Sequence, residues 1–317
     1  MVKSEALHDL FSSGLERFLS VYPTDGLYAP IHYLLNISGK RIRPLLALSV
    51  CEAEGSTIDK AMPVAVAVEL FHNFTLMHDD IMDCAPLRRG QSTVHKKFGE
   101  NAAILSGDAM FSLAFSSLEE SPQGSLREVL KVFNRTARQV CEGQQSDMEF
   151  ETQEAVTIDD YLEMIRLKTS VLLAASCALG AISAGATTDR VNLWYKYGEK
   201  MGLAFQIQDD ILDTFGNALN TGKKVGGDIA AEKKTFIWLY TQQKGALSPH
   251  FLSQLHGQEK IEKVRDAMRE VGADVAAQKK MNVYAEEAIS ALSELGLDSE
   301  KRMLFSGLVS SVMRRSS

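Results

Sequence analysis

The chain has 317 residues, of which 45% are hydrophobic, and its formal net charge is −7 with a pI near 5.6. This length and apolar content are sufficient for a large buried core, in one large domain or two ordinary ones. The negative charge argues against a nucleic-acid-binding surface, so any positive site has to be local. The four cysteines are widely spaced, which argues against a disulfide scaffold or a zinc motif and predicts reduced thiols.

The amino terminus, residues 1–19, mixes charged and apolar residues with helical periodicity and lacks the unbroken apolar core of a signal peptide. The best membrane candidate, residues 171–186, is shorter than the roughly 20 residues that cross a bilayer. Its alanine, serine and glycine content is typical of a helix packed closely against other helices. We therefore predict a cytoplasmic protein without a membrane span.

Helical periodicity dominates the chain, and no run of strand-type alternation is bounded by turn residues. Residues 63–83 are apolar on nearly every face, which predicts a central helix that Asp59 could cap. Further helices are predicted over residues 101–118, 126–150, 158–168, 171–184 and 188–213. The helix at 158–168 is expected to be capped by Thr157 or Asp159.

The last third of the chain contains no clear domain boundary. A break rich in glycine and lysine covers residues 216–227, and residues 228–315 alternate charged and apolar residues, as peripheral helices do. No linker or shift of composition divides the sequence. We therefore predict an all-α fold in which residues 1–317 form one large helical domain.

The predicted helix at residues 63–83 ends in three closely spaced carboxylates, Asp79, Asp80 and Asp83. Residues four apart lie on one helix face, so Asp79 and Asp83 are neighbours and their charges repel. A hard cation such as Mg²⁺ would relieve this repulsion, because it prefers carboxylate oxygens and also binds water and substrate phosphates. Arg88 and Arg89 follow, and arginine pairs suit phosphate oxygens. The stretch predicts a metal-bridged phosphate site.

The same pattern recurs at the end of a second apolar helix, in Asp209, Asp210 and Asp213, again ahead of basic residues. A solvated helix end could explain one copy of Asp-Asp-x-x-Asp, but it is a poor explanation for two. The two helix ends could face each other across one cavity and together hold several metal ions.

Two further basic segments accompany the aspartates. Residues 39–44 read Gly-Lys-Arg-Ile-Arg-Pro, which alone could be a solvated basic face; beside Arg88 and Arg89 they predict a second, metal-free anion pocket. The loop at residues 221–228 combines glycines with lysines. It could close over a phosphate, or it could be a solvated surface loop.

As an ordered set, these motifs resemble those of the trans-isoprenyl diphosphate synthases, the family that makes farnesyl, geranylgeranyl and longer prenyl diphosphates. The set comprises Gly-Lys-x-x-Arg-Pro, Asp-Asp-x-x-Asp, Arg-Arg-Gly, Lys-Thr, Phe-Gln-x-x-Asp-Asp-x-x-Asp and the glycine- and lysine-rich loop. The resemblance implies a helical bundle around a central cavity, usually as a homodimer. There, isopentenyl diphosphate would condense with C5, C10 or C15 allylic diphosphates, with about three Mg²⁺ ions per site.

The resemblance also implies roles for individual residues. The positions that match metal ligands or their supports are Asp79, Asp83 and Asp209, with Asp80, Asp210 and Asp213. Those that match contacts to the allylic diphosphate are Arg88, Lys168 and Lys223 or Lys233, with Lys224 competing for the role of Lys223. Those that match the isopentenyl diphosphate pocket are Lys40, Arg43, His72 and Arg89. The polar groups that match positions facing the developing carbocation are Thr169 and Gln206. Without the resemblance, His72 would be interpreted as a core histidine.

Product length is expected to depend on the helix below the first aspartates. Phe74 and Phe71 lie close to the aspartate face and are predicted to form a floor for the growing chain, beside the small Thr75. In the family, a bulky aromatic residue at such a position suits C15 to C20 products. The first motif also lacks the two-residue insertion typical of bacterial farnesyl synthases, which favours geranylgeranyl diphosphate.

Three alternatives remain open on the sequence: a longer-chain synthase, a terpene cyclase and a non-catalytic synthase subunit. A cyclase has no need of the second anion pocket, and a non-catalytic subunit would be expected to have lost one aspartate motif. Both motifs are intact in this chain.

Overall fold

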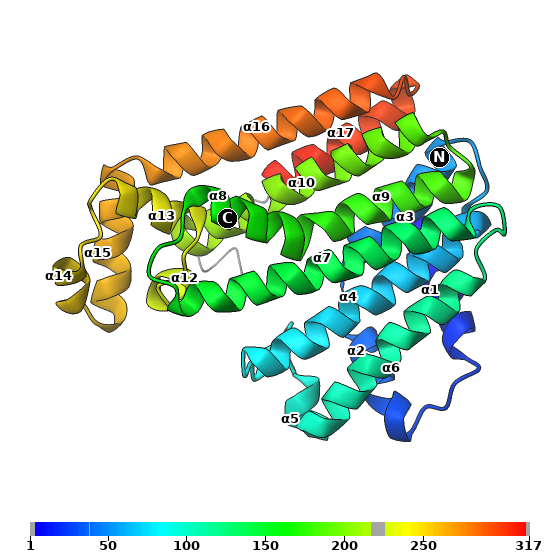
Figure 1. Cartoon of the computed structure of the whole chain (residues 1–317), viewed down its shortest axis with the longest axis horizontal. Helices are drawn as coiled ribbons and strands as arrows, with labels where there is room; N and C mark the ends of the chain where they lie inside the picture. The colour runs from blue at the N-terminus through cyan, green and yellow to red at the C-terminus, as the bar shows by residue number, and fades with distance from the viewer. Residues whose placement is uncertain (1–3, 38, 217–225, 315–317) are drawn as a thin grey trace. The chain divides into compact units, whose positions relative to one another are not determined.

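The computed structural model describes residues 4–37, 39–216 and 226–314. These residues are almost wholly helical, as Figure 1 shows, so the all-α prediction is confirmed. The first helices are α1 (Ser4–Leu19), α2 (Ala29–Asn36), α3 (Ile42–Ala53), α4 (Met62–Met82), α5 (Val94–Phe98), α6 (Glu100–Glu119) and α7 (Leu126–Thr152). The later ones are α8 (Ile158–Ile165), α9 (Val171–Ala184), α10 (Thr188–Phe215), α12 (Gly227–Ala230), α13 (Phe236–Gln243), α14 (Pro249–Ser253), α15 (Gly257–Glu270), α16 (Ala273–Glu294) and α17 (Ser299–Met313).

The chain divides into two compact units. The first comprises Met1–Ala137 with Ala175–Tyr195, and the second comprises Arg138–Ala174 with Lys196–Ser317. Helices α7, α9 and α10 therefore each contribute residues to both units. The first aspartate motif and the basic segment at residues 39–44 belong to the first unit, and the second aspartate motif belongs to the second.

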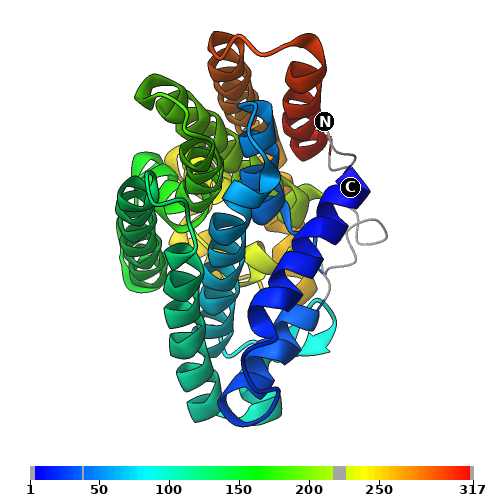
Figure 2. The same ribbon diagram turned by 90° about the vertical axis from the view of Figure 1, so that its right-hand side faces the viewer.

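The first unit is built around α4, which packs against α6, α3 and α1. Figure 2 shows α1 in dark blue on the near side of these helices. Residues 64–68 of α4 are all buried, as expected for a helix that is apolar on every face. The predicted cap was wrong: Asp59 lies in the 3-10 turn η2 (Ile58–Ala61), which leads directly into α4 with no side-chain cap.

A short hairpin follows α4 and was not predicted. Strands β1 (Leu87–Arg88) and β2 (Gln91–Ser92) pair antiparallel, and Arg89 and Gly90 at the tip have φ values of 50° and 76°. Two successive positive φ angles are the signature of a two-residue type I′ turn. With two residues each, the strands are too short to produce the alternation by which strands are recognised in a sequence.

The second unit contains a change of helix type at the Lys-Thr motif. Helix α8 begins in a capping box in which Thr157 accepts from the Asp160 amide, which confirms Thr157 as its cap. The predicted helix at 158–168 stays α-helical only to Ile165 and continues as a π-helical turn, η3 (Arg166–Ser170), before α9. Such wide turns are frequent at functional sites, because they redirect side chains within a continuous helix.

Two glycines allow neighbouring helices to approach this π-helical turn closely. A Cβ atom on Gly143 of α7 would lie 2.3 Å from the backbone nitrogen of Lys168, and one on Gly202 of α10 would lie 2.7 Å from Cα of Ser170. Both distances are too short for a real side chain. The turn that carries Lys168 and Thr169 is therefore held by backbone packing that only glycine permits.

One stretch, Ile158–Ala184, is long and apolar enough to cross a membrane by length and composition. However, 78% of its most apolar window is buried inside the folded chain, as in a core helix of a soluble protein. This burial supports the interpretation of residues 171–186 as a packed interior helix.

We predict that Gly143→Ala lowers the free energy of unfolding by about 1 to 3 kcal/mol, because the added methyl group overpacks against η3. The measurement is urea unfolding of the two variants and the wild type. Gly307→Ala is the matched control, because Gly307 lies in α17 with nothing within 4 Å of its Cβ position. Equal stability of the two variants would contradict the packing argument.

Candidate active site

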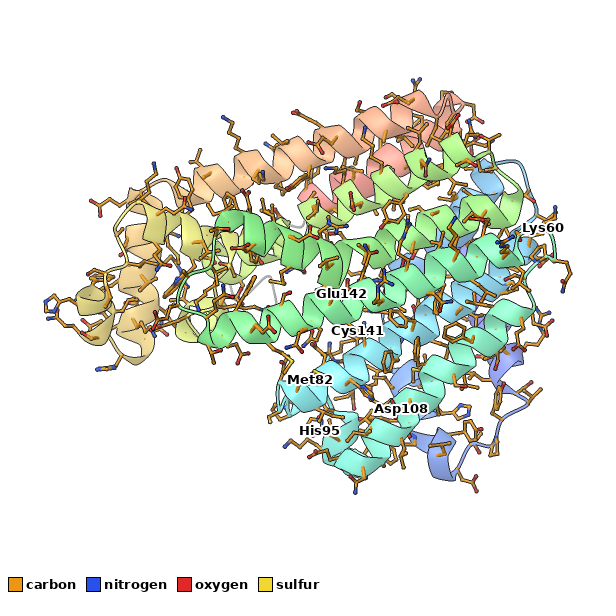
Figure 3. The ribbon with its side chains drawn as sticks, viewed as in Figure 1. Lys60, Met82, His95, Asp108, Cys141 and Glu142 are labelled. Carbon is orange, nitrogen blue, oxygen red and sulfur yellow. The ribbon has the colours of Figure 1, made fainter. Side chains whose placement is uncertain are left out.

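The first aspartate motif lies at the carboxyl end of α4. The Asp83 amide donates to the Asp79 carbonyl at 2.9 Å, which closes the last helical turn and keeps both residues on one face, as predicted. Figure 3 labels Met82 at this end of α4 and His95 on α5, beyond the hairpin. Cys84 then takes a φ of 50°, which ends the helix.

Arg88 neutralises the buried member of the motif. Asp80 is 1% exposed, and Nε of Arg88 donates to its two carboxylate oxygens at 2.9 and 2.8 Å, while Nη2 lies 2.8 Å from Oδ1. Nη2 also lies 3.7 Å from Oδ2 of Asp79. A buried carboxylate requires such a partner, so this ion pair attaches the hairpin to the end of α4.

The two remaining carboxylates have the character of ligands for a hydrated cation. The Asp79 side chain is 21% exposed and Asp83 is exposed. In the part of the chain that the structure describes, no three His, Cys, Asp or Glu side chains gather into a group that could hold a metal ion. One or two carboxylates completed by water and phosphate oxygens are the usual way in which proteins bind Mg²⁺, so the residues present fit this ion.

Arg43 and His72 form the centre of a basic pocket in the same unit. Nη1 of Arg43 donates to Nε2 of His72 at 3.1 Å. Burial lowers the pKa of Arg43 to about 10, and burial together with Arg43 and Arg89 holds the pKa of His72 well below 6.5. His72 is therefore neutral and acts as an acceptor. Arg89 approaches from the hairpin tip, where its guanidinium occupies the space beside Gly39, and Lys40 is exposed.

A buried carboxylate that the sequence analysis missed supports this pocket. Glu69 is 3% exposed; it accepts from the guanidinium of Arg41 and from Nδ2 of Asn73 at 2.7 Å. Arg41 also donates to the Leu35 carbonyl and has a φ of 48°, in the left-handed region. The side-chain bonds of Arg41 therefore stabilise a strained backbone conformation at this residue, directly before the first residue of α3.

The helix below the first aspartates carries an aromatic cluster. The Phe74 ring stacks on Phe111 of α6 at 5.1 Å between centroids, and Phe71 contacts both Phe74 and Phe111 at 5.6 Å. Phe71 is 1% exposed, whereas Phe74 is partly exposed. The Thr75 hydroxyl donates to the carbonyl of His72 at 2.8 Å. Sequence analysis found the α4 members of this cluster but missed Phe111, which only the packing of α4 on α6 brings to them.

The second aspartate motif lies in the second unit, near the carboxyl end of α10. Asp209 is partly exposed, Asp210 is 3% exposed, and Oδ1 of Asp213 accepts from the amide of Asp228 at 2.9 Å. Burial raises the pKa of Asp210 to about 8, while hydrogen bonds from Tyr161 and Gln206 act in the opposite direction. As in the first motif, the middle carboxylate is interior and the first remains accessible.

The predicted polar pair, Thr169 and Gln206, is brought together. The Thr169 hydroxyl donates to Oε1 of Gln206 at 3.2 Å, and Nε2 of Gln206 lies 3.4 Å from Oδ1 of Asp210. Residues 37 positions apart in the sequence are thus joined by η3 and α10. The prediction that this pair faces a carbocation stays a prediction.

Two of the predicted lysines meet at a carboxylate that the sequence analysis missed. Nζ of Lys168 lies 2.6 Å from Oδ2 of Asp147, and Nζ of Lys233 lies 4.0 Å from its Oδ1. Lys234 instead donates to the carbonyls of Phe150 and Gln153 at the end of α7. Asp147 holds both amino groups where a diphosphate could replace it as their anionic partner. The predicted contact at Lys223, with its competitor at 224, lies outside the described residues.

Comparison with known proteins agrees with these motifs. The model of the polyprenyl synthetase family matches residues 24–271. The chain therefore belongs to the polyprenyl synthetase family. A geranylgeranyl diphosphate synthase of Methanosarcina mazei is 41% identical over 77% of this chain and 75% of its own length. A geranylfarnesyl diphosphate synthase of Aeropyrum pernix is 33% identical over 94% of this chain and 96% of its own.

The fold gives the same result. A crystal structure of a geranylgeranyl pyrophosphate synthase matches with a TM-score of 0.92 at 40% identity, covering 100% of both chains. The resemblance inferred from the motifs is thereby confirmed. As a polyprenyl synthetase, the chain is a prenyltransferase that makes short-chain prenyl diphosphates.

We predict that the neutral His72 of this polyprenyl synthetase makes its stability sensitive to acid. The unfolded histidine takes up a proton near pH 6.5, but the folded one resists it beside Arg43. The contribution of His72 to the free energy of unfolding is therefore fully present above pH 6.5. Below that pH it is lost at about 1.4 kcal/mol per pH unit. Urea unfolding at pH 7, 6 and 5 should show that His72→Gln loses less stability than the wild type. Parallel losses would mean that His72 is charged in the folded state.

Proposed function

We propose that this prenyltransferase is a Mg²⁺-dependent synthase of geranylgeranyl diphosphate, with farnesyl diphosphate as a further product. One observation carries the assignment. The hairpin after α4 directs Arg88 to the first aspartate motif and Arg89 toward Arg43 and His72, which supports the assignment of two separate anion sites. An enzyme that joins two diphosphates requires two such sites, whereas a terpene cyclase requires one.

The allylic diphosphate is assigned to the aspartate motifs. Asp79, Asp83 and Asp209 would ligate about three Mg²⁺ ions. When bound, the ions neutralise the diphosphate and make it a better leaving group. Asp80 and Asp213 support these ligands through the ion pair with Arg88 and the bond from the Asp228 amide, and Asp210 does so from the interior of its motif.

The cationic side chains complete the allylic site. Lys168, Lys233 and Arg88 bind phosphate oxygens, with Lys223 assigned by its sequence motif alone. Asp147 lies within ion-pair distance of both lysines and holds their amino groups close together until the diphosphate arrives. Charge-assisted hydrogen bonds of this kind stabilise the negative charge that develops on the diphosphate as the C–O bond breaks.

Isopentenyl diphosphate is assigned to Lys40, Arg43, His72 and Arg89. Arg43 contributes fixed positive charge, and the neutral His72 orients it without adding a charge of its own. In the second unit, the Thr169 hydroxyl and the Gln206 amide are assigned to present dipoles to the allylic cation. Neither group carries a nucleophilic charge that would trap the cation.

The remaining assignments rest on the family and on the sequence. We propose that residues 1–317 work as a single catalytic domain, that the protein forms a homodimer, and that it acts in the cytoplasm on the two diphosphate substrates. The competing assignment is a main product longer than C20; the non-catalytic subunit considered from the sequence is set aside, because the chain is a prenyltransferase.

The assignment is tested by incubating the purified protein with Mg²⁺, labelled isopentenyl diphosphate and each of the C5, C10 and C15 allylic diphosphates. Sizing the products by chromatography should show C20, with some C15, from the shorter starters. Products longer than C20 would establish the longer-chain alternative. A pure homomer that gives no product from any of the three starters would contradict the assignment.

Removal of either accessible aspartate should abolish metal-dependent catalysis. We expect Asp79→Ala and Asp209→Ala each to lower kcat by about 10²-fold or more at saturating Mg²⁺, with unchanged circular dichroism, because the leaving group loses its neutralising charge. Asp108→Ala is the control, since Asp108 is an exposed aspartate of α6 in the first unit (Figure 3). Near-wild-type rates for either motif variant would refute the metal assignment.

Phe74 should limit product length. In Phe74→Ala, the ring that stacks on Phe111 is lost and the space it filled becomes available to the growing chain, so the product distribution should shift beyond C20. Phe18→Ala removes a partly buried aromatic ring of α1 outside this cluster and should leave the distribution unchanged. Product chromatography decides, and an unaltered distribution in Phe74→Ala would exclude Phe74 as the floor.

A further inference from the structure

Tyr161 of α8 is a buried polar residue that the assignments above do not use. It is 1% exposed, and its hydroxyl donates to Oδ2 of Asp210, in the middle of the second aspartate motif. The Asp210 partner is itself 3% exposed. A buried hydroxyl and a buried carboxyl group form such a bond because leaving either group unpaired would destabilise the folded state.

The bond is the first of a series of hydrogen bonds that ends at Thr169. Oδ2 of Asp210 accepts from Tyr161, and its Oδ1 accepts from Nε2 of Gln206 at 3.4 Å. Oε1 of Gln206 accepts from the Thr169 hydroxyl at 3.2 Å. Four residues from α8, η3 and α10 are therefore joined in one hydrogen-bonded row within the second unit.

The row determines which end of the Gln206 amide faces Thr169. A primary amide donates from its nitrogen and accepts at its oxygen, so it has two orientations that differ by a half-turn. An acceptor at Asp210 selects the orientation with the nitrogen toward Asp210 and the oxygen toward Thr169. Without the Tyr161 hydroxyl as a second donor, the Asp210 carboxyl group would no longer be fixed in place. The Gln206 amide would then lack a fixed acceptor that selects one of its two orientations.

We propose that Tyr161 is a positioning residue: through Asp210, its hydroxyl orients the Gln206 amide so that the carbonyl oxygen faces Thr169 and the allylic cation. The inference rests on the proposed roles of Gln206 and Thr169. Tyr161 suits this function because a neutral donor fixes the carboxyl group without introducing a cation, which would repel the allylic cation.

Local structure makes Tyr161 well placed for this task. Its amide donates to the carbonyl of Thr157, the capping residue, at 3.1 Å, so the backbone of Tyr161 is held in the first turn of α8. The same helix continues into η3, which carries Thr169. One rigid segment therefore sets both ends of the hydrogen-bonded row.

The first test is Tyr161→Phe, which removes one oxygen and keeps the ring. We expect kcat to fall about tenfold while KM for each diphosphate stays within twofold, since the diphosphate contacts are untouched. Tyr197→Phe is the matched control: Tyr197 is also fully buried in the second unit, and its hydroxyl donates to the Phe305 carbonyl at 2.9 Å. A loss of kcat shared by both variants, or a rise in KM instead, would overturn the proposal.

A double-mutant cycle separates positioning from general stability. In a Gln206→Leu background, adding Tyr161→Phe should change kcat by less than twofold, because the residue through which Tyr161 acts is already gone. Independent, multiplicative losses would overturn the proposal. If Gln206→Leu alone keeps the wild-type rate, the proposed role of Gln206 fails instead, and the inference fails with it.

Unnatural residues provide a test that does not depend on the folding of the phenylalanine variant. We would replace Tyr161 by 4-aminophenylalanine, which retains a donor, and by 4-fluorophenylalanine, which fills similar space without one. The amino variant should keep kcat within about twofold of the wild type, and the fluoro variant should lose about tenfold. Equal rates would overturn the proposal.

Discussion

The ion pair between Arg88 and Asp80 is the interaction on which the first unit's site depends. Asp80 is almost completely buried at the end of α4, and a buried carboxylate without a partner would strongly destabilise the fold. Arg88 satisfies it from a type I′ hairpin, and this geometry places the neighbouring Arg89 toward the basic pocket instead. Asp79 and Asp83 keep accessible carboxylates because Asp80 alone takes the interior position. The buried aspartate thus anchors the hairpin, and the two accessible ones are those that the proposed function assigns to the metal.

The second aspartate motif also has one buried and one accessible carboxyl group, but the buried one has different hydrogen-bond partners. Its middle carboxyl group, Asp210, is also interior, but its partners are the neutral donors Tyr161 and Gln206 rather than an arginine. Two lysines of this unit, Lys168 and Lys233, lie instead at Asp147. Neutral donors at Asp210 suit the proposed role of Thr169 and Gln206 beside an allylic cation, and the paired lysines suit the proposed binding of a diphosphate.

Much of the architecture followed from sequence pattern. Helical periodicity predicted α4, α6, α7, α9 and α10 within a few residues of their observed ends, because an apolar helix must match its buried surface to the 3.6-residue repeat. Where the prediction failed, the local signal was too short or was overridden by neighbouring structure. The hairpin strands have two residues each, and Asp59 was not needed as a cap because η2 runs directly into α4.

The helical class, the family and the candidate residues within the motifs could all be inferred from the amino-acid sequence, since residue types and spacing are local properties of the chain. The residues that support these motifs became visible only in the folded structure. Four supporting residues lie outside the sequence motifs. They are Glu69, which pairs with Arg41; Asp147, which pairs with Lys168; Tyr161, which donates to Asp210; and Phe111, which stacks on Phe74. Their contributions depend on contacts between segments distant along the chain. Such contacts exist only after the helices pack, and no spacing rule encodes them.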